Sequence, residues 1–307
     1  MNTAAHRHLL VERIRALSRP MNPLPAGVRP KTPKLGPLRA VLFDVYGTLF
    51  ISGSGDISLA NPSHNVTALA EALAESGFLT KNPQEAARIG ARLFVEEIER
   101  VHAARRAEGI AFPEVDVRRI WRAALMRLQK KSPIRGELAD ARIERLAVEY
   151  ECRVNPVWPM PGALDALEAL RGAGILLGIV SNAQFFTPLL FEAFWEKPPV
   201  DLGFDLDLCF WSWETLEAKP GDALFGKKAA EKLVARGIAP GETLYVGNDM
   251  RNDVLPAARA GFRTALFAGD KRSLRLREDD ADCADIAPDA VVTEWGQVVA
   301  FFPGLKA

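Results

Sequence analysis

The stretch AVLFDVYGTLF, residues 40–50, places an acid directly after a short apolar run. Residues 41–43 (Val-Leu-Phe) have the composition of a strand that is covered on both faces. Asp44 ends the run, and in open parallel sheets ligands bind beyond the carboxyl ends of the strands. The stretch therefore predicts a buried strand of an α/β sheet with Asp44 at the ligand-binding edge. A carboxylate that merely caps the turn is the alternative.

Apolar runs alternate with helical patterns from residue 158 onward. In residues 162–174 three leucines recur on one helical face before a Gly stop, and residues 175–180 then form a buried apolar run. Alternation of this kind is typical of βαβ units and a parallel sheet. Further strands are predicted at 206–211, 243–248 and 263–268, and further helices at 222–236 and 253–260.

Residues 52–157 have a different period. Within 116–128 apolar side chains recur at helical spacing behind an Asp that is placed as an N-cap. The pattern predicts an all-helical insertion between two parts of one core, residues 39–51 and 158–307. Because the insertion begins just after the acid, we expect it to cover the ligand-binding edge as a lid. Similar helical stripes occur in 66–76, 84–104 and 141–150.

The composition is that of an ordinary soluble globular chain. Of 307 residues, 48% are apolar and 25% are charged, which favours about two domains. No apolar run approaches membrane-spanning length. The three cysteines are far apart, so neither a disulfide framework nor a zinc site is indicated. We expect a cytoplasmic protein, monomeric or homodimeric, that binds neither nucleic acid nor membrane.

Residues 1–38 form a basic segment. Residues 1–39 carry eight Lys or Arg against a single acid, so their charge is +7 and that of the remainder is −7. Six prolines within 20–37 predict an extended linker, preceded by a short helix over 9–17. Contact with an acidic partner or a membrane surface is one interpretation. A solvated, poorly ordered terminus is the expected one.

Four polar stretches follow predicted strands or precede predicted helices in the core. Because the carboxyl ends of parallel strands open on one edge of a sheet, we expect these stretches to meet there. Each alone has an ordinary explanation, such as a capping Ser or a surface Lys. The stretches contain Asp44 with Tyr46, Ser181 with Asn182, Lys219, and Asn248 with Asp249 and Asp253.

These stretches resemble the motifs of the haloacid dehalogenase-like (HAD) superfamily, hydrolases that use an aspartate nucleophile. The resemblance covers about residues 39–268 and rests on FDVYGTL, VSN, KPGDALF and, most specifically, VGNDMRNDVLPAARAGF. It implies a Rossmann-like parallel sheet with an α-helical, C1-type cap inserted after the first motif. This agrees with the division expected from periodicity.

The resemblance implies the catalytic roles. Asp44 would be the nucleophile; an ionised Asp, with a reference pKa of about 3.9, attacks without a base but weakly. Lys219 would neutralise the nucleophile and the charge that develops on the substrate, and the Ser181 hydroxyl would help to hold an oxyanion. Asn182, in the same motif as Ser181, belongs to this set. Attack would give an acyl-phosphate or an ester, which water then hydrolyses.

Three carboxylates would face one another at this edge. Two carboxylates about 4 Å apart repel by about 4 kcal/mol at an effective dielectric of about 20, and one lysine cannot offset three such charges. Either a proton is retained or a cation lies among them, and hard oxygen ligands favour Mg²⁺. The expected ligands are Asp44, the backbone carbonyl of Tyr46, Asn248, Asp249 and Asp253.

Tyr46 stands where most phosphatases of the superfamily carry a second Asp, which acts as general acid and then as base. An alkoxide leaves badly without a proton, whereas a halide leaves without one. Relatives that cleave carbon–halogen bonds in 2-haloacids commonly read Asp-x-Tyr-Gly-Thr at this place, so Tyr46 favours dehalogenation. In magnesium-dependent members only the backbone carbonyl is needed, and this would make the tyrosine a tolerated substitution.

The fourth motif favours the opposite conclusion. Metal-independent dehalogenases typically show Ser-Ser-Asn-x-x-Asp there, whereas this chain has Asn248 for the first Ser, Met250 for the Asn, and the added charge of Asp249. The sequence therefore predicts a Mg²⁺-dependent phosphatase that acts on a small organic phosphate. The alternatives are a metal-independent 2-haloacid dehalogenase, a phosphonate-type hydrolase, and a catalytically weak binding protein of the same fold.

A cationic patch in the insertion suits a small anionic substrate. Residues 100–109 (RVHAARRAEG) place His102 and Arg105 on adjoining helical positions, and Arg92 lies a few turns earlier. We predict these three residues as substrate contacts. The alternative for each is a solvated helix face.

Overall fold

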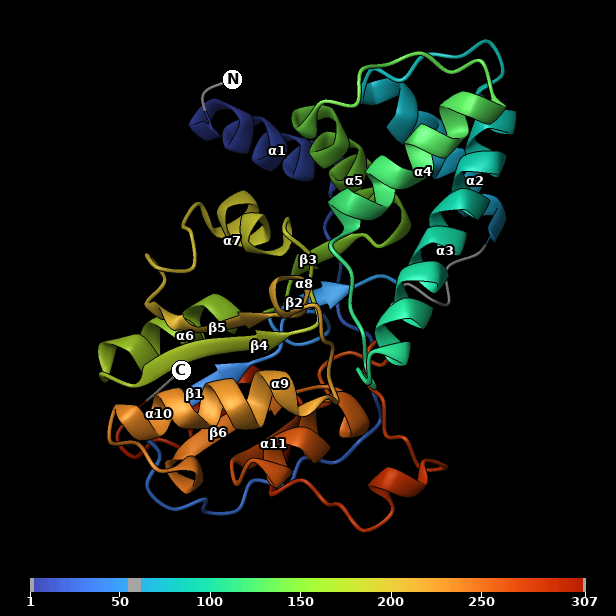
Figure 1. Ribbon diagram of the computed structural model, residues 1–307. Helices are drawn as coiled ribbons and strands as arrows, with labels where there is room; N and C mark the ends of the chain where they lie inside the picture. The colour runs from blue at the N-terminus through green and yellow to red at the C-terminus, as the bar shows by residue number, and fades with distance from the viewer. Residues whose placement is uncertain (1–2, 55–61, 306–307) are drawn as a thin grey trace.

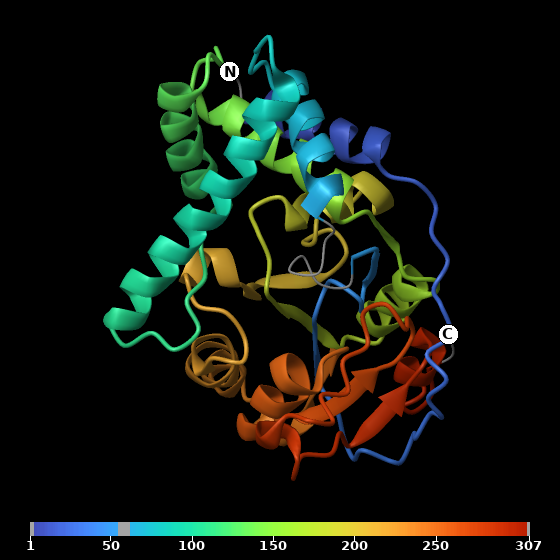
Figure 2. The same ribbon diagram turned by 90° about the vertical axis from the view of Figure 1, so that its right-hand side faces the viewer.

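The computed structural model describes residues 3–54 and 62–305 and shows an α/β core beside a helical insertion (Figures 1 and 2). Within these residues the core sheet has six parallel strands in the order β5-β4-β1-β6-β7-β8. The Rossmann-like α/β fold that the sequence predicts is confirmed. The strands are β1 (Ala40–Phe43), β4 (Leu176–Ser181), β5 (Phe204–Trp211), β6 (Thr243–Gly247), β7 (Arg263–Phe267) and β8 (Ala290–Val292).

β1 lies in the middle of the sheet, and its apolar side chains are buried on both faces. Val41 and Phe43 belong to the apolar core on one face, and Leu42 belongs to the core on the other. β1 pairs with β4 on one side and with β6 on the other, so the order of the strands reverses there. At such a switch point a crevice opens beyond the carboxyl ends of the strands. Asp44 follows β1 directly into this crevice.

Helices cover both faces of the sheet (Figure 1). The helix predicted over 222–236 is one helical segment whose middle, Phe225–Ala230, has a wider, π-type turn. One face carries α6 (Ala163–Gly172), α7 (Thr187–Trp195) and α12 (Trp295–Val299); the other carries α9 (Asp222–Leu224), α10 (Glu231–Ala235) and α11 (Leu255–Arg259). Short helical turns occupy Ser212–Thr215 (α8), Pro240–Glu242, Met250–Val254 and Ala281–Cys283.

The insertion leaves and re-enters the core at adjacent points. β2 (Phe50–Ser52) pairs antiparallel with β3 (Val157–Pro159). Along the chain, the helices of the insertion come after β2 and before β3. Asp116 caps α4 as expected, since its carboxylate accepts a hydrogen bond from the backbone N–H of Arg118 at 3.0 Å. The insertion helices are α2 (Pro62–Glu75), α3 (Pro83–Ala107), α4 (Val117–Lys131) and α5 (Asp140–Val154).

The N-terminal helix is packed, which corrects the expectation of a solvated, poorly ordered terminus. α1 (Thr3–Leu17) lies beside α5 of the insertion and α7 of the core (Figure 1). Leu10, Val11 and Ile14 are buried in this contact. The sequence predicts a short helix here but does not indicate what it packs against. The segments that cover its apolar side chains are more than a hundred residues away in the chain.

The basic side chains of α1 pair with acids on both neighbouring helices. Arg13 forms an ion pair with Glu149 of α5 at 2.6 Å, and Arg7 pairs with Glu192 of α7. The basic residues that indicated a solvated tail therefore form ion pairs that link α1 to the insertion and to the core. No helix among residues 3–54 and 62–305 is long and apolar enough to cross a membrane.

Ile14→Ala tests the packing of α1. Ile14 is 1% exposed, and truncating a buried Ile to Ala lowers the free energy of unfolding by about 2–5 kcal/mol. Leu9 of the same helix is 42% exposed, so Leu9→Ala should change it by less than about 0.5 kcal/mol. Urea unfolding followed by circular dichroism measures both variants. Equal, small losses would show that α1 does not pack on the rest of the chain in solution.

Candidate active site

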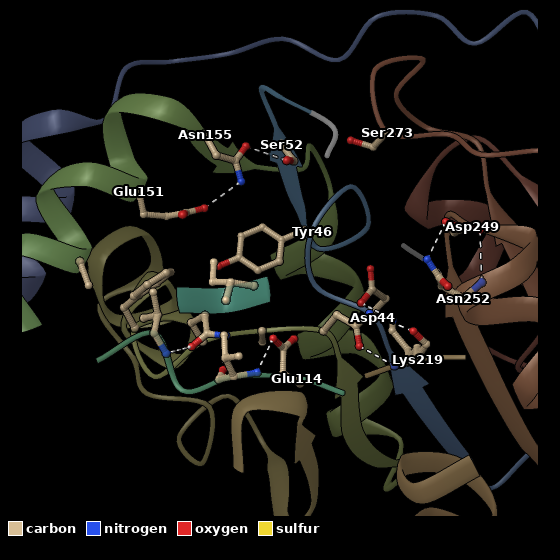
Figure 3. Close-up of a pocket in the computed structure, with 18 of the residues that line it drawn as sticks. Asp44, Tyr46, Ser52, Glu114, Glu151, Asn155, Lys219, Asp249, Asn252 and Ser273 are labelled. Atoms are coloured by element: carbon tan, nitrogen blue, oxygen red, sulfur yellow. Dashed lines mark hydrogen bonds and ion pairs between the residues drawn. The ribbon is translucent and has the colours of Figure 1, made fainter. Parts of the chain in front are cut away.

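The polar stretches of the sequence meet beyond the carboxyl ends of β1, β4 and β6 (Figure 3). Asp44 follows β1, Ser181 ends β4, and Lys219 comes from the loop after α8. They lie at one end of a cavity of about 380 Å³ that extends beneath the insertion. Asn248, Asp249 and Asp253 also line this cavity.

One oxygen of the Asp44 carboxylate is held and the other is open. The Ser181 hydroxyl donates to Oδ1 at 2.9 Å, and the Lys219 ammonium donates to the same oxygen at 2.7 Å. Among the residues that the structure describes, no donor reaches Oδ2. Oδ2 is therefore the oxygen that is available to attack a substrate in the cavity.

Lys219 lies buried between two carboxylates. Its Nζ is 2.7 Å from Asp44 Oδ1 and 2.6 Å from Asp253 Oδ1. Burial lowers the pKa of Lys219, but the nearby charges of Asp253 and Asp44 outweigh burial and raise it, so the side chain stays cationic. Burial raises the pKa of Asp253 to about 6, against the opposing charge of Lys219.

Asp253 uses its whole hydrogen-bonding capacity within the protein. Its Oδ1 accepts from Lys219 and from the Tyr245 hydroxyl, at 2.6 and 2.9 Å. Its Oδ2 accepts from the backbone N–H groups of Asn248 and Asp249, both at 2.9 Å. A carboxylate has about four lone-pair sites, and all of them are filled here. Asp253 is a positioning residue that fixes the loop after β6 and the Lys219 ammonium.

Asp249 is neutralised by an arginine that the motif analysis missed. Arg277 forms a bidentate pair with it, from Nε to Oδ1 at 3.1 Å and from Nη2 to Oδ2 at 2.6 Å. The same carboxylate caps the following turn by accepting from the backbone N–H groups of Arg251 and Asn252, at 2.9 and 3.2 Å. Arg277 therefore provides a second cation where the sequence argument called for a metal ion.

The oxygens of Asp249 and Asp253 accept hydrogen bonds within the protein, so their role as magnesium ligands, which would require these donors to move, stays a prediction. The described residues contain no group of three or more His, Cys, Asp or Glu that could hold a metal ion. What remains for a cation is the carboxylate of Asp44, the amide oxygen of Asn248 and the Tyr46 carbonyl, all hard oxygens. A magnesium requirement stays a prediction that rests on these three residues.

Tyr46 lines the cavity with its hydroxyl directed away from Asp44 (Figure 3). The hydroxyl forms a hydrogen bond with Thr187 Oγ1 at 2.9 Å. Burial raises the pKa of Tyr46 far above its ordinary value, so the phenol keeps its proton. Asn182 has a positioning role, since its side-chain oxygen accepts from the Lys219 backbone N–H at 2.7 Å and holds the lysine loop.

The cationic patch predicted in the insertion does not form. Only His102 lines the cavity, and its pKa is lowered by burial and by Arg106, so it is uncharged near neutral pH. Arg92 pairs with Glu96 on the exposed face of α3, and Arg105 pairs with Glu108. Arg92 and Arg105 are therefore not substrate contacts in this structure, because their helical neighbours engage them away from the cavity.

Arg275 is a further cavity residue that the motif analysis missed. Its guanidinium donates to the backbone carbonyls of Arg272 and Leu274, at 2.7 and 3.0 Å, and pairs with no carboxylate of the described residues. Backbone hydrogen bonds to Asn248 and Met250 hold its segment against the loop after β6. The available signal was the run KRSLRLRE, residues 271–278, whose four basic residues follow the predicted strand at 263–268.

A carboxylate beside a hydroxyl and a lysine, at the edge of a Rossmann-like sheet, is an arrangement suited to hydrolysis through a covalent aspartyl intermediate. The family model of haloacid dehalogenase-like hydrolases matches residues 38–261. The chain belongs to this family, as its motifs indicated. No curated protein matches it.

Solved structures of both dehalogenases and phosphatases are similar to the chain. The 2-haloacid dehalogenase of Pseudomonas syringae pv. Tomato DC3000 is 20% identical, with a TM-score of 0.52 over 86% of this chain and 97% of that one. The HAD phosphatase of Thermococcus onnurineus is 17% identical, with a TM-score of 0.49 over 88% of this chain and 100% of that one. The likeness to the dehalogenase structure indicates a shared fold, and the reaction has to be argued from the site.

Proposed function

We propose that this hydrolase cleaves a small organic phosphate with Asp44 as its nucleophile. The observation that supports a phosphate is Arg275, a residue that lines the cavity and whose guanidinium has no carboxylate partner among the described residues. The planar guanidinium group of an arginine binds the oxygens of phosphate well. A bound phosphate dianion would supply the negative counter-charge that no carboxylate provides for Arg275.

The reaction has two steps. Asp44 Oδ2 attacks phosphorus, the bond to the alcohol oxygen breaks, and the alkoxide takes a proton from water. Water then attacks the phosphorus of the acyl-phosphate, which releases inorganic phosphate and restores the carboxylate. Lys219, whose Nζ is 2.7 Å from Asp44 Oδ1, neutralises the charge that develops on the phosphoryl oxygens. A Mg²⁺ ion held by Asp44, Asn248 and the Tyr46 carbonyl would add to this neutralisation.

A second candidate reaction is dehalogenation of a 2-haloacid. Two observations favour it: the Tyr46 hydroxyl is engaged with Thr187, and Arg277 neutralises Asp249 without a metal. Asp44 would attack the carbon that bears the halogen and expel halide, and water would then hydrolyse the ester to a 2-hydroxyacid. A halide leaves without a proton, so this reaction has no need of an acid at position 46.

Two assays separate the candidates. Phosphate release from para-nitrophenyl phosphate and halide release from 2-chloropropionate are each measured with Mg²⁺ and with EDTA. We expect phosphate release, and its loss in EDTA would support the metal site at Asp44 and Asn248. Halide release that EDTA leaves unchanged, with no phosphate release, would replace the phosphatase proposal by the second candidate.

Arg275→Gln should raise KM for para-nitrophenyl phosphate with a smaller effect on kcat. A hydrogen bond to a charged group contributes about 1.5–3 kcal/mol, which corresponds to an increase in KM of about 10- to 150-fold. Arg119→Gln is a matched control, because the Arg119 side chain is 79% exposed on α4. Steady-state kinetics measure both variants, and an unchanged KM in Arg275→Gln would remove this residue from phosphate binding.

A further inference from the structure

The cavity has two ends with different charge. Beyond the sheet edge, Lys219, Arg275 and Arg277 accompany the three aspartates. Two more carboxylates line the cavity: Glu151 of α5, under the insertion, and Glu114 of the loop before α4, which accepts a hydrogen bond from Ser212 just beyond β5. Figure 3 shows Glu151 across the cavity from Asp249.

Neither of these two glutamates has a cationic partner within the described part of the chain. Glu151 accepts one hydrogen bond, from the Asn155 amide at 3.2 Å. Glu114 accepts from the Ser212 hydroxyl at 2.9 Å and from the Val115 backbone N–H at 2.8 Å. Burial raises the pKa of both, that of Glu151 to about 7. A carboxylate that is withdrawn from water without a counter-charge is costly, so a cation that enters the cavity would relieve this cost.

Aromatic rings line the same cavity as these glutamates. Phe94 stacks on Trp121 with ring centroids 4.1 Å apart, and Tyr150 meets the edge of Trp121 at 5.3 Å. All three rings line the cavity, and so does His102, whose Nε2 has no hydrogen-bond partner. Aromatic faces attract organic cations, most strongly where water is excluded. Carboxylates and aromatic faces together make the environment that binds an organic ammonium group.

We propose that the substrate is zwitterionic, a small organic phosphate whose alcohol part carries an ammonium group bound by Glu151 and the rings of Phe94 and Trp121. The phosphate half of this inference rests on the proposed function. The ammonium half rests on the far end of the cavity alone. A neutral alkyl group would contact the rings but would leave Glu151 without a counter-charge.

The test compares phosphocholine with 3,3-dimethylbutyl phosphate, which has the same shape and lacks the positive charge. We expect kcat/KM for phosphocholine to be at least about tenfold higher. Glu151→Gln should reduce this ratio to below about threefold. Glu168→Gln, at a side chain 51% exposed on α6, should leave it unchanged. A wild-type ratio near one would overturn the proposal, whatever happens to the folding of the variants.

Binding measurements distinguish a failure of this inference from a failure of the proposed function. Calorimetry with Asp44→Asn protein measures the affinity for both compounds without turnover. Tighter binding of phosphocholine, in a protein whose wild type hydrolyses neither compound, would support the ammonium site and reject the phosphatase reaction. Equal binding of the two compounds, in a protein whose wild type hydrolyses phosphates, would reject the ammonium site and support the reaction.

Discussion

Asp44→Asn should abolish turnover, with kcat lower by roughly 10⁴-fold or more, as for other covalent nucleophiles. The amide oxygen can still accept hydrogen bonds from Ser181 and Lys219, which now meet at Asp44 Oδ1. An amide is a far weaker nucleophile than a carboxylate, so attack through Oδ2 stops. The expected loss is the same for phosphate and for halide release, because both candidate reactions pass through a covalent intermediate on Asp44, an acyl-phosphate in one case and an ester in the other.

Purified variants show whether the loss of activity comes from the missing nucleophile or from misfolding. Asp165→Asn, at an exposed position of α6, should keep full activity. Asp44→Asn should keep its thermal unfolding midpoint within a few degrees of the wild type, because Lys219 retains its 2.6 Å contact with Asp253. Substantial activity in a well-folded Asp44→Asn protein would contradict the covalent mechanism for every substrate considered above.

Lys219→Met should damage both catalysis and stability. The ammonium is the one cation that contacts both Asp44 and Asp253 among the described residues, and these contacts are 2.7 and 2.6 Å long. Breaking a buried ion pair by removing one partner costs about 3–5 kcal/mol, because the remaining charge is left uncompensated. We expect kcat to fall by about 10²- to 10³-fold or more, since the charge that develops in the transition state loses its cation.

The stability of Lys219→Met should also depend on pH in a defined direction. Burial already holds the pKa of Asp253 at about 6, above its ordinary value, and loss of the ammonium raises that pKa further. A carboxyl group with a raised folded pKa favours folding at low pH, and this contribution is lost as pH rises through the folded pKa. The variant should therefore lose stability relative to the wild type as pH rises through about 6 and above it.

Urea unfolding at several pH values measures this effect. Lys197→Met provides the control, because Lys197 is 45% exposed and pairs with the exposed Glu168. An exposed pair of this kind contributes about 0–1 kcal/mol, with little change across the same pH range. If both lysine variants lost the same small amount of stability at every pH, Lys219 would not be the buried counter-ion that its contacts indicate.

Local patterns in the sequence were sufficient to predict the core of the site. The apolar run before Asp44 and the alternation after residue 158 identified a parallel sheet. In such a sheet the carboxyl ends of the strands open on one edge. The sequence therefore predicts that one site contains Asp44, Ser181 and Lys219. The helices of the insertion followed from a 3.6-residue period in the same way.

Partners that come from distant segments could not be predicted. Arg277 reaches Asp249 only because the segment after β7 folds back on the loop after β6, as the backbone hydrogen bonds of Arg275 show. Arg92 and Arg105 were predicted to face the substrate, but helical spacing alone does not say which side of α3 the cavity occupies. α1 was expected to be solvated, because its apolar residues have no partner close in sequence.

The sequence alone is sufficient to assign the fold class and the family of this protein, and it predicts Asp44 as the nucleophile. These properties depend on the periodicity of apolar residues and on the residue types at strand ends. Both are local features of the sequence, so they can be read without knowing which distant segments are in contact. Only the tertiary structure decided how each charge is balanced. Arg277 meets Asp249, Lys219 lies between Asp44 and Asp253, and Glu151 is left without a cation. Charge balance depends on distances of a few ångströms between segments far apart in the chain, and only tertiary packing sets such distances.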